Sequence, residues 1–419
     1  MAESSAALAP STPWYREVSP AAWKVLRFAG VAWTFDVFDS FLLSLTIPAL
    51  IATFKLSNSE AGAIGSILAA GLIVGGIVMG YVADRIGRVR ALVISVLVYS
   101  VFSSATALAP SGSWVAVLRF CAGLGMGGGW TSGAALVAET WDPRHRGKGG
   151  ALMQMGLPVG SMLAIGIAAL VTELAGGLEG NGWRILYALC LIPGLILLVL
   201  ARFTPESPIW RRRAQEPAPR GQISDLFRPE NRHGLLLAFG FIFFAQYIYW
   251  GVFTWTPTFL VSVKHLAFIR SLGFTMSQQI GSLLGFLVFA ALVDRLGRRP
   301  TFLIYLAIGA IAVSVFVLVS SQLVLMVTVF FTGFGITGIF AGLGPLTAEL
   351  VPNTAARGLS MGVAYNGGRL GGLIAPYLIG ALASSASGFM IGMATTILAF
   401  VLAAIVIALA PETRGTELA

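Results

Sequence analysis

The feature that most constrains this chain is a series of apolar runs, each long enough to cross a bilayer. A spanning helix needs roughly 20 mostly apolar residues, and twelve such runs occur between short polar, glycine or proline breaks. Their approximate limits are 24–54, 60–83, 90–110, 112–138, 148–172, 184–203, 234–263, 272–293, 299–319, 322–350, 358–384 and 387–410. Only 11% of the residues are charged, too few to cover soluble domains of this length. We therefore expect an all-α membrane protein with twelve transmembrane helices.

One polar stretch is much longer than the others and divides the runs into two groups of six. Residues 204–233 carry several prolines and arginines, and no apolar run of spanning length lies within them. We therefore predict an N-terminal six-helix bundle over 1–203, a cytoplasmic linker over 204–233 and a C-terminal six-helix bundle over 234–419.

The basic residues lie mostly on one side of the predicted membrane. If the N-terminus is cytoplasmic, 21 of the 27 Lys and Arg residues fall in cytoplasmic segments, four fall on the opposite side and two lie within spans. Such an excess marks the cytoplasmic side. We therefore expect both termini in the cytoplasm and a multi-pass protein of the plasma membrane, which in bacteria is the inner membrane. The net charge of +9 follows from this topology and does not indicate nucleic-acid binding.

The two predicted bundles share motifs at a constant spacing. Asp84-Arg85-Ile86-Gly87-Arg88 recurs as Asp294-Arg295-Leu296-Gly297-Arg298, and Gly123-Leu124-Gly125 recurs as Gly333-Phe334-Gly335, both 210 residues later. Glu139 matches Glu349 at the same offset. Parallel repeats related by an axis along the membrane normal are typical of transporters whose site lies at the repeat interface. The duplication therefore favours a transporter, although a channel or receptor can also be duplicated.

These motifs resemble those of the major facilitator superfamily. The DRxGR loops look like its signature loop, and Arg119-xxx-Gly123-x-Gly125-x-Gly127 resembles its fourth-helix motif. Pro205-Glu206-Ser207-Pro208 and Pro411-Glu412-Thr413-Arg414-Gly415 resemble the loop motifs of its sugar-porter-like branches. The resemblance covers the chain from the first span to the C-terminus. It implies a two-bundle transporter that works by alternating access.

Two further segments resemble a narrower group within that superfamily. Trp33-Thr34-Phe35-Asp36-Val37-Phe38-Asp39 looks like the first-helix DxxD pattern of organic-acid:proton symporters, which include aromatic-acid, sialate/lactate and nicotinate transporters. Arg369 resembles the eleventh-helix arginine of the same groups. Val37 stands where the usual aromatic-acid form has glycine. The resemblance implies proton-coupled transport of an organic acid.

Charge inside the predicted spans points to the same residues without reference to any family. Ionisable groups deep in a membrane are costly unless paired or hydrated, so they are functional candidates. Four stand out, namely Asp36, Asp39, Arg119 and Arg369. The two aspartates are three residues apart and so share roughly one helix face, which suits reversible protonation of a pair. At the 210-residue offset Asp36 maps to Gln246 and Asp39 to Tyr249, so only the first half keeps the carboxylates.

We assign roles to these four residues as a hypothesis. Asp36 and Asp39 would carry the proton. Arg119 would shift their pKa by pairing alternately with one and the other. Arg369 would bind a substrate carboxylate, because a guanidinium offers two parallel donors to it. The two arginines could exchange these roles. Alternatively, Arg119 forms a fixed structural pair with one aspartate, and Arg369 bonds backbone carbonyls.

Polar and aromatic residues of the seventh span form a candidate binding wall opposite the first span. Gln246, Tyr249 and Trp250 combine flat rings with polar groups, and Asn366, one turn before Arg369, is a similar candidate. The competing interpretation is that such residues face lipid or act as interfacial anchors.

The duplicated loops carry charges that we interpret as a cytoplasmic gate. This set comprises Asp84, Arg85, Arg88 and Glu139 with their copies Asp294, Arg295, Arg298 and Glu349. In the family such pairs lock the cytoplasmic side, which is what the resemblance implies here. Plain topology signals would explain the arginines, but they would not explain the repetition of Asp and Gly.

These observations favour proton-coupled symport of a small carboxylate-bearing organic anion. Two alternatives stay open: a neutral sugar or polyol carrier of the same fold, and a non-transporting membrane receptor. The expected partners are the organic anion, protons and membrane lipid, and no obligate protein partner is evident. No catalytic motif, metal-ligand spacing or cofactor site is recognisable, so we expect no enzyme, metal or cofactor.

Overall fold

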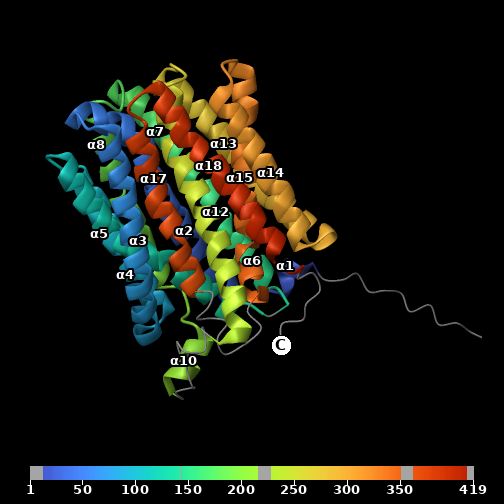
Figure 1. Ribbon diagram of the computed structural model, residues 1–419. Coiled ribbons are helices and arrows are strands. Elements are labelled where there is room, and N and C mark those ends of the chain that lie inside the picture. The colour runs from blue at the N-terminus through green and yellow to red at the C-terminus, as the bar shows by residue number, and fades with distance from the viewer. Residues whose placement is uncertain (1–12, 143, 216–227, 351–361, 413–419) are drawn as a thin grey trace, which may run out of the picture.

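All regular elements are helices in the computed structural model, which describes residues 13–142, 144–215, 228–350 and 362–412. The first half contains α1 (Trp14–Glu17), α2 (Pro20–Phe54), α3 (Asn58–Ile86), α4 (Arg88–Thr106), α5 (Gly112–Thr140), α6 (Arg146–Gln154), α7 (Gly156–Ala175), α8 (Gly182–Ala188) and α9 (Leu191–Ala201). After α10 (Pro208–Gln215) come α12 (Pro229–Ser262), α13 (Phe268–Leu296), α14 (Arg298–Leu318), α15 (Gln322–Leu350), α17 (Leu370–Leu382) and α18 (Ala386–Leu409). Figure 1 shows the long helices side by side in one bundle, with α10 at one end of it. The all-α prediction is confirmed.

Ten segments of the described chain are long and apolar enough to cross a membrane. Two of them are interrupted helices, because α6 with α7 and α8 with α9 each form one segment. Two predicted runs are not among the ten segments. The run 112–138 coincides with α5, whereas the run 358–384 contains helical residues 362–368 and α17, and its residues 358–361 lie outside the described part. The number twelve therefore remains a prediction.

The DRxGR motif makes the same tight turn in both halves. The chain passes from α3 to α4 through Gly87 (φ 103°) and from α13 to α14 through Gly297 (φ 99°). This backbone conformation strains any residue with a Cβ, which explains why glycine is repeated. The next helix then begins without a capping side chain of its own.

A glutamate from a distant loop caps each of these helices. Glu206 accepts hydrogen bonds from the backbone N–H of Arg88 (2.9 Å) and Val89 (3.1 Å). Glu412 accepts them from Arg298 (2.9 Å) and Arg299 (3.0 Å). A carboxylate at a helix N-terminus satisfies free donors and complements the helix dipole. Glu206 and Glu412 therefore hold equivalent places in the two halves, and residues 413–415 of the PETRG motif lie outside the described part.

We name the end of the bundle that carries both DRxGR turns the basic end and the opposite end the far end. In Figure 1, α1 and α10 lie at the basic end. Two of the few cations at the far end cap helix C-termini: Arg184 donates to the carbonyl of Ala107 (2.6 Å), and Lys264 to that of Val319 (2.6 Å). Partial burial lowers the pKa of the Lys264 ammonium. These cations are thus engaged with helix ends.

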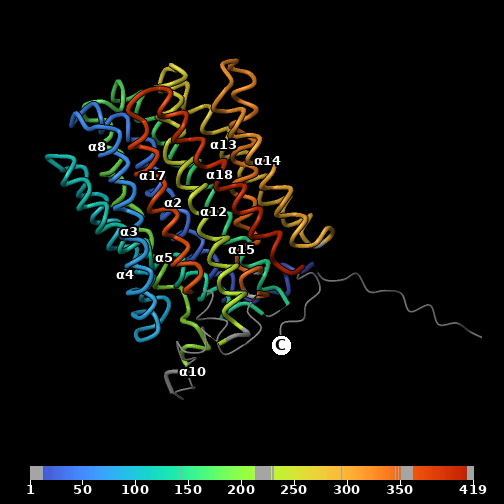
Figure 2. Tube along the Cα trace, viewed as in Figure 1, coloured from blue at the N-terminus to red at the C-terminus, as the bar shows by residue number. Residues whose placement is uncertain are grey.

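Among the described residues, the two halves pack together mainly along α3 with α17, α7 with α13 and α2 with α12. Figure 2 shows α3 and α17 side by side although they stand far apart in the sequence. Near the far end Asn58 Nδ2 donates to the Ala383 carbonyl (2.5 Å), and the Tyr377 N–H donates to Ser66 Oγ (3.2 Å). A Cβ at Gly62 would overlap the Pro376 carbonyl. The far end is therefore closed where α3 and α17 meet, because their backbones pack directly against each other.

Candidate functional site

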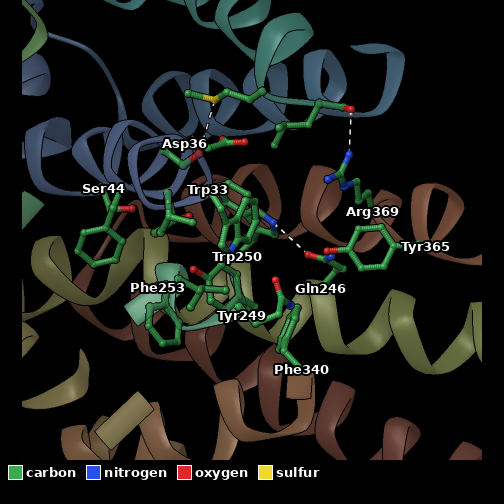
Figure 3. A pocket seen from close by; sticks show the side chains of 18 residues that line it. Trp33, Asp36, Ser44, Gln246, Tyr249, Trp250, Phe253, Phe340, Tyr365 and Arg369 are labelled. Atoms are coloured by element: carbon green, nitrogen blue, oxygen red, sulfur yellow. Dashed lines mark hydrogen bonds between the residues drawn. The ribbon is translucent and has the colours of Figure 1, made fainter. Parts of the chain in front are cut away.

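A cavity of about 80 Å³ lies between the two halves. Its first-half walls come mainly from α2, and its second-half walls come mainly from α12 (Figure 3). The lining side chains are Trp33, Asp36, Val37, Ser40, Phe41, Ser44, Leu72, Met126, Gln154, Leu157, Gln246, Tyr249, Trp250, Phe253, Thr254, Phe340, Tyr365 and Arg369. Two of them, Asp36 and Arg369, carry opposite formal charges. This interface position is where a duplicated transporter places its ligand.

Asp36 faces this cavity with one oxygen unsatisfied. The residue is only 3% exposed, and its Oδ2 has no hydrogen-bond partner among the described residues. The oxygen fits beside Gly129, where a Cβ would lie 2.6 Å away. Asp36 is also within electrostatic range of Arg369. A buried carboxylate in this situation is costly as an ion unless a cation or a proton reaches it.

Arg369 reaches the cavity from the other half. It lies just before α17 and is 8% exposed. Its Nη1 donates to the Leu72 carbonyl of α3 (3.0 Å) and to Asn366 Oδ1 (3.3 Å). A guanidinium carries five donors, so Nη1 anchors the group and other donors remain to meet an anion. Arg369 thus bonds a backbone carbonyl, as one interpretation of the sequence predicted, and it also lines the candidate site.

The residues of the predicted binding wall lie together on α12, and their role in binding stays a prediction. Gln246, Tyr249 and Trp250 all line the cavity. Trp250 Nε1 donates to Gln246 Oε1 (3.1 Å), and Tyr249 stacks on Phe253 with ring centroids 4.6 Å apart. The wall is thus aromatic with one amide, suited to a flat or conjugated ligand.

The second aspartate is turned away from the cavity. Asp39 pairs with Arg119 (2.9 Å), and both side chains have zero exposure. Ser103 donates to Asp39 Oδ2, and the Arg119 guanidinium lies 4.8 Å from the ring centroid of Tyr187. Arg119 is therefore paired inside the first half, as in the structural alternative considered from sequence. Asp36 and Asp39 share a helix but not an environment.

The predicted gating charges form one cluster in each half. Arg88 pairs with Asp84 (2.6 Å) and Glu139 (3.3 Å), and Ser207 also donates to Glu139. In the second half Arg298 pairs with Glu349 (3.1 Å).

Two further residues of the predicted gating set, Arg85 and Arg295, have described side chains. The Arg85 guanidinium lies over the Tyr81 ring, Arg295 is exposed, and the Asp294 side chain lies outside the described part. The two clusters join helices within a half, and their gating role stays a prediction.

A wider vestibule of about 830 Å³ lies toward the basic end. Residues of α1, α5 and α6 line one side, and residues of α13 and α15 line the other. Asn366, predicted to bind substrate, lines this vestibule and contacts Arg369 rather than lining the cavity. The molecule is thus closed at the far end and hollow at the basic end.

Several cavity residues were not among the sequence candidates. Trp33, Ser40 and Ser44 lie three residues before, four after and eight after Asp36, so helical spacing could have placed them on its face. Trp33 is the most informative, because its Nε1 has no hydrogen-bond partner among the described residues. Gln154, Phe340 and Tyr365 carried no such signal. Within the described ranges, no group of three His, Cys, Asp or Glu residues could hold a metal ion.

The chain is similar in sequence to bacterial transporters over nearly its whole length. It is 34% identical over 405 residues to a "probable 4-methylmuconolactone transporter" from Cupriavidus pinatubonensis, covering 96% of this chain and 93% of the relative. It is 33% identical over 386 residues to a cis,cis-muconate transport protein from Acinetobacter baylyi, covering 88% and 90%. A niacin transporter from the same organism is 27% identical over 430 residues, covering 94% and 95%.

The fold has a close counterpart among solved structures. The inward-open xylose transporter XylE from E. coli superimposes with a TM-score of 0.78 at 21% identity, covering 95% of this chain and 98% of XylE. The Major Facilitator Superfamily matches residues 30–277 and 271–419. The relatives are transporters rather than enzymes. This chain, a multi-pass membrane protein and not an enzyme, belongs to the major facilitator superfamily.

Proposed function

We propose that this protein is a proton-coupled symporter that carries a small carboxylate-bearing organic anion by alternating access. The observation that carries the proposal is that Asp36 and Arg369, two buried groups of opposite charge from opposite halves, line one small cavity. The names of the relatives support an organic acid, since they include muconate, niacin and gentisate transporters. The bacterial inner membrane is the expected location.

Charge balance explains why anion and proton would travel together. With Asp36 ionised and Arg369 protonated, the two side chains sum to zero charge. An anion on Arg369 together with a proton on Asp36 leaves that sum unchanged. Either ligand alone would leave one uncompensated charge in a poorly hydrated place, which is costly. Loading both is therefore the favoured way to fill the cavity.

The cavity also limits the substrate by size and shape. A water needs about 10–15 Å³ of such volume, so the cavity of 80 Å³ corresponds to about five to eight waters and accommodates only a small molecule. The walls supply aromatic faces from Tyr249 and Trp250 and polar contacts from Gln246 and the Trp33 N–H. We expect a flat, conjugated or aromatic acid of about one ring.

The test is uptake by purified protein in liposomes under an inward proton gradient. The panel contains cis,cis-muconate, nicotinate, gentisate, lactate and sialate, with xylose as the neutral control. We expect accumulation of at least one acid, and its loss when a protonophore is added. Uptake of xylose alone would favour the sugar-carrier alternative. Tight binding without flux would favour a receptor.

Asp36→Asn separates coupling from binding. The neutral amide leaves Arg369 as the net charge of the cavity, so an anion can load without a proton. We expect proton-driven accumulation to fall to the background, whereas exchange of labelled for unlabelled acid persists. Accumulation at the parent level by Asp36→Asn would contradict the coupling.

Arg369→Gln tests the anion contact. Loss of a charge-assisted hydrogen bond of about 1.5–3 kcal/mol should raise the KM for the acid by about tenfold or more. Arg270→Gln is the control, because Arg270 is an exposed arginine at the far-end start of α13. An unchanged KM in Arg369→Gln would place the anion elsewhere.

A further inference from the structure

Two aromatic rings from different halves meet at the boundary between the cavity and the vestibule. Trp130 belongs to α5, and Tyr365 lies in the helical segment before α17. Their ring centroids are 4.3 Å apart and their planes are 13° from parallel. Both rings line the vestibule, and Tyr365 also lines the cavity. The stack therefore lies beside the boundary that a molecule crosses between the two spaces.

Neighbouring polar groups hold both rings in position. Trp130 Nε1 donates to Gln154 Oε1 (2.9 Å), and Gln154 is the last residue of α6, beside the break that separates it from α7. The Arg369 guanidinium lies 5.2 Å from the centroid of the Tyr365 ring. Gln154 itself lines both spaces. The stack is thus fixed by one residue of the first half and by the cation of the candidate site.

The contrast with the far end shows what this contact can do. There, the backbones of α3 and α17 approach closely at Gly62 and Pro376, and the Asn58 side chain bonds the Ala383 carbonyl, so opening requires whole helices to separate. The Trp130–Tyr365 contact consists of two side chains in front of an open vestibule. Side-chain rotation is much faster than domain rearrangement. The stack can therefore open while the far end stays closed.

We propose that Trp130 and Tyr365 form a side-chain gate on the cytoplasmic side of the substrate cavity, with Gln154 as the residue that positions Trp130. The gate separates the cavity from the vestibule in this conformation and opens by unstacking of the rings. The cytoplasmic assignment follows from the excess of basic residues at that end. This proposal depends on the proposed function only in one respect, namely which molecule passes the gate.

Thiol accessibility measures the gate without any substrate. Ser40 lines the cavity, so Ser40→Cys is the reporter, in a background with Cys121→Ser that keeps the fully buried Cys190. Inside-out membrane vesicles receive a charged, membrane-impermeant methanethiosulfonate reagent at the cytoplasmic face. The rate of modification is compared among gate variants, and a chain without the reporter gives the background.

We expect Trp130→Ala and Tyr365→Ala to raise the modification rate by about tenfold, the scale set by loss of an aromatic pair. Gln154→Leu should raise it less, and Trp130→Phe, which keeps a ring, should stay near the parent. Trp114→Ala is the matched control, because Trp114 lies on the same helix but is 55% exposed on the outer surface. Parent-like rates in both alanine variants would overturn the gate.

Two further arms keep the result interpretable. If an alanine variant fails to fold, Trp130→Leu and Tyr365→Leu keep apolar volume without a ring, and the same rise is expected. Faster modification in a chain that transports no acid on the panel would sustain the gate and reject the proposed function. Acid transport by the parent, with an unchanged modification rate in the gate variants, would support the proposed function and reject the gate.

Discussion

The two halves of this protein share a scaffold but not a chemistry. Each has a DRxGR turn with glycine at positive φ, and each has a distant glutamate that caps the following helix. The cores differ at equivalent positions. The first half buries the Asp39–Arg119 ion pair, whereas the residues 210 positions later are Tyr249, within an aromatic cluster, and Val329.

The difference between the two cores shows how a duplicated fold can carry different chemistry in each half. The turns and caps are needed in both halves because both must fold in the same way. The cavity needs one carboxylate and one guanidinium on opposite walls, and duplicating both groups would place like charges together in a poorly hydrated space. The first half supplies Asp36, and the second supplies Arg369 and the aromatic wall.

The largest expected effect comes from breaking the ion pair of the first half. Arg119→Met leaves Asp39 as an unpaired buried charge, which costs about 3–5 kcal/mol of unfolding free energy. The double variant Asp39→Asn, Arg119→Met removes that charge and should recover part of the loss. Thermal unfolding in detergent measures both.

The matched control for this pair lies in the other half. Tyr249→Phe alters the counterpart of Asp39 without creating a charge, and its cost should stay below about 1 kcal/mol. A parent-like stability of Arg119→Met, or a double variant less stable than either single one, would show that the pair is not a structural element of the first half.

A smaller effect should follow from filling the space beside Asp36. Gly129→Ala would put a Cβ 2.6 Å from Asp36 Oδ2, and the carboxylate would have to turn away from its place in the cavity. Overpacking of this kind costs about 1–3 kcal/mol, so we expect proton-driven uptake to fall by about tenfold.

Gly166→Ala is the control for this variant, because no atom lies within 4 Å of the added Cβ. The position 210 residues after Gly129 is Ile339, so the second half lacks this space altogether. Equal uptake by the two alanine variants would mean that the room beside Asp36 is not used.

The sequence predicts the features that the free energy of membrane insertion restricts, namely the length and apolarity of the helices and the few charged residues within them. Apolar runs locate the helices because a span must be long and apolar. Asp36 and Arg369 stand out because charge within a span requires a reason. The glycine of DRxGR repeats because of its positive φ.

Tertiary arrangement decides the rest. Asp36 and Asp39 differ by only about 60° around α2, and that rotation sends one to the cavity and the other to Arg119. Spacing alone could not distinguish them, because the neighbouring helices come from distant segments. The Trp130–Tyr365 stack depends in the same way on how two halves meet.

The smallest expected effect tests the shared scaffold. Glu206→Ala and Glu412→Ala each remove a carboxylate that accepts backbone hydrogen bonds at a helix start. Each should cost about 1 kcal/mol of unfolding free energy, and the double variant should cost about the sum because the sites are far apart. Glu173→Ala, an exposed glutamate of α7, is the control. A loss in Glu206→Ala without one in Glu412→Ala would mean that the halves differ in their caps as well as in their cores, because equivalent geometry would then carry unequal energy.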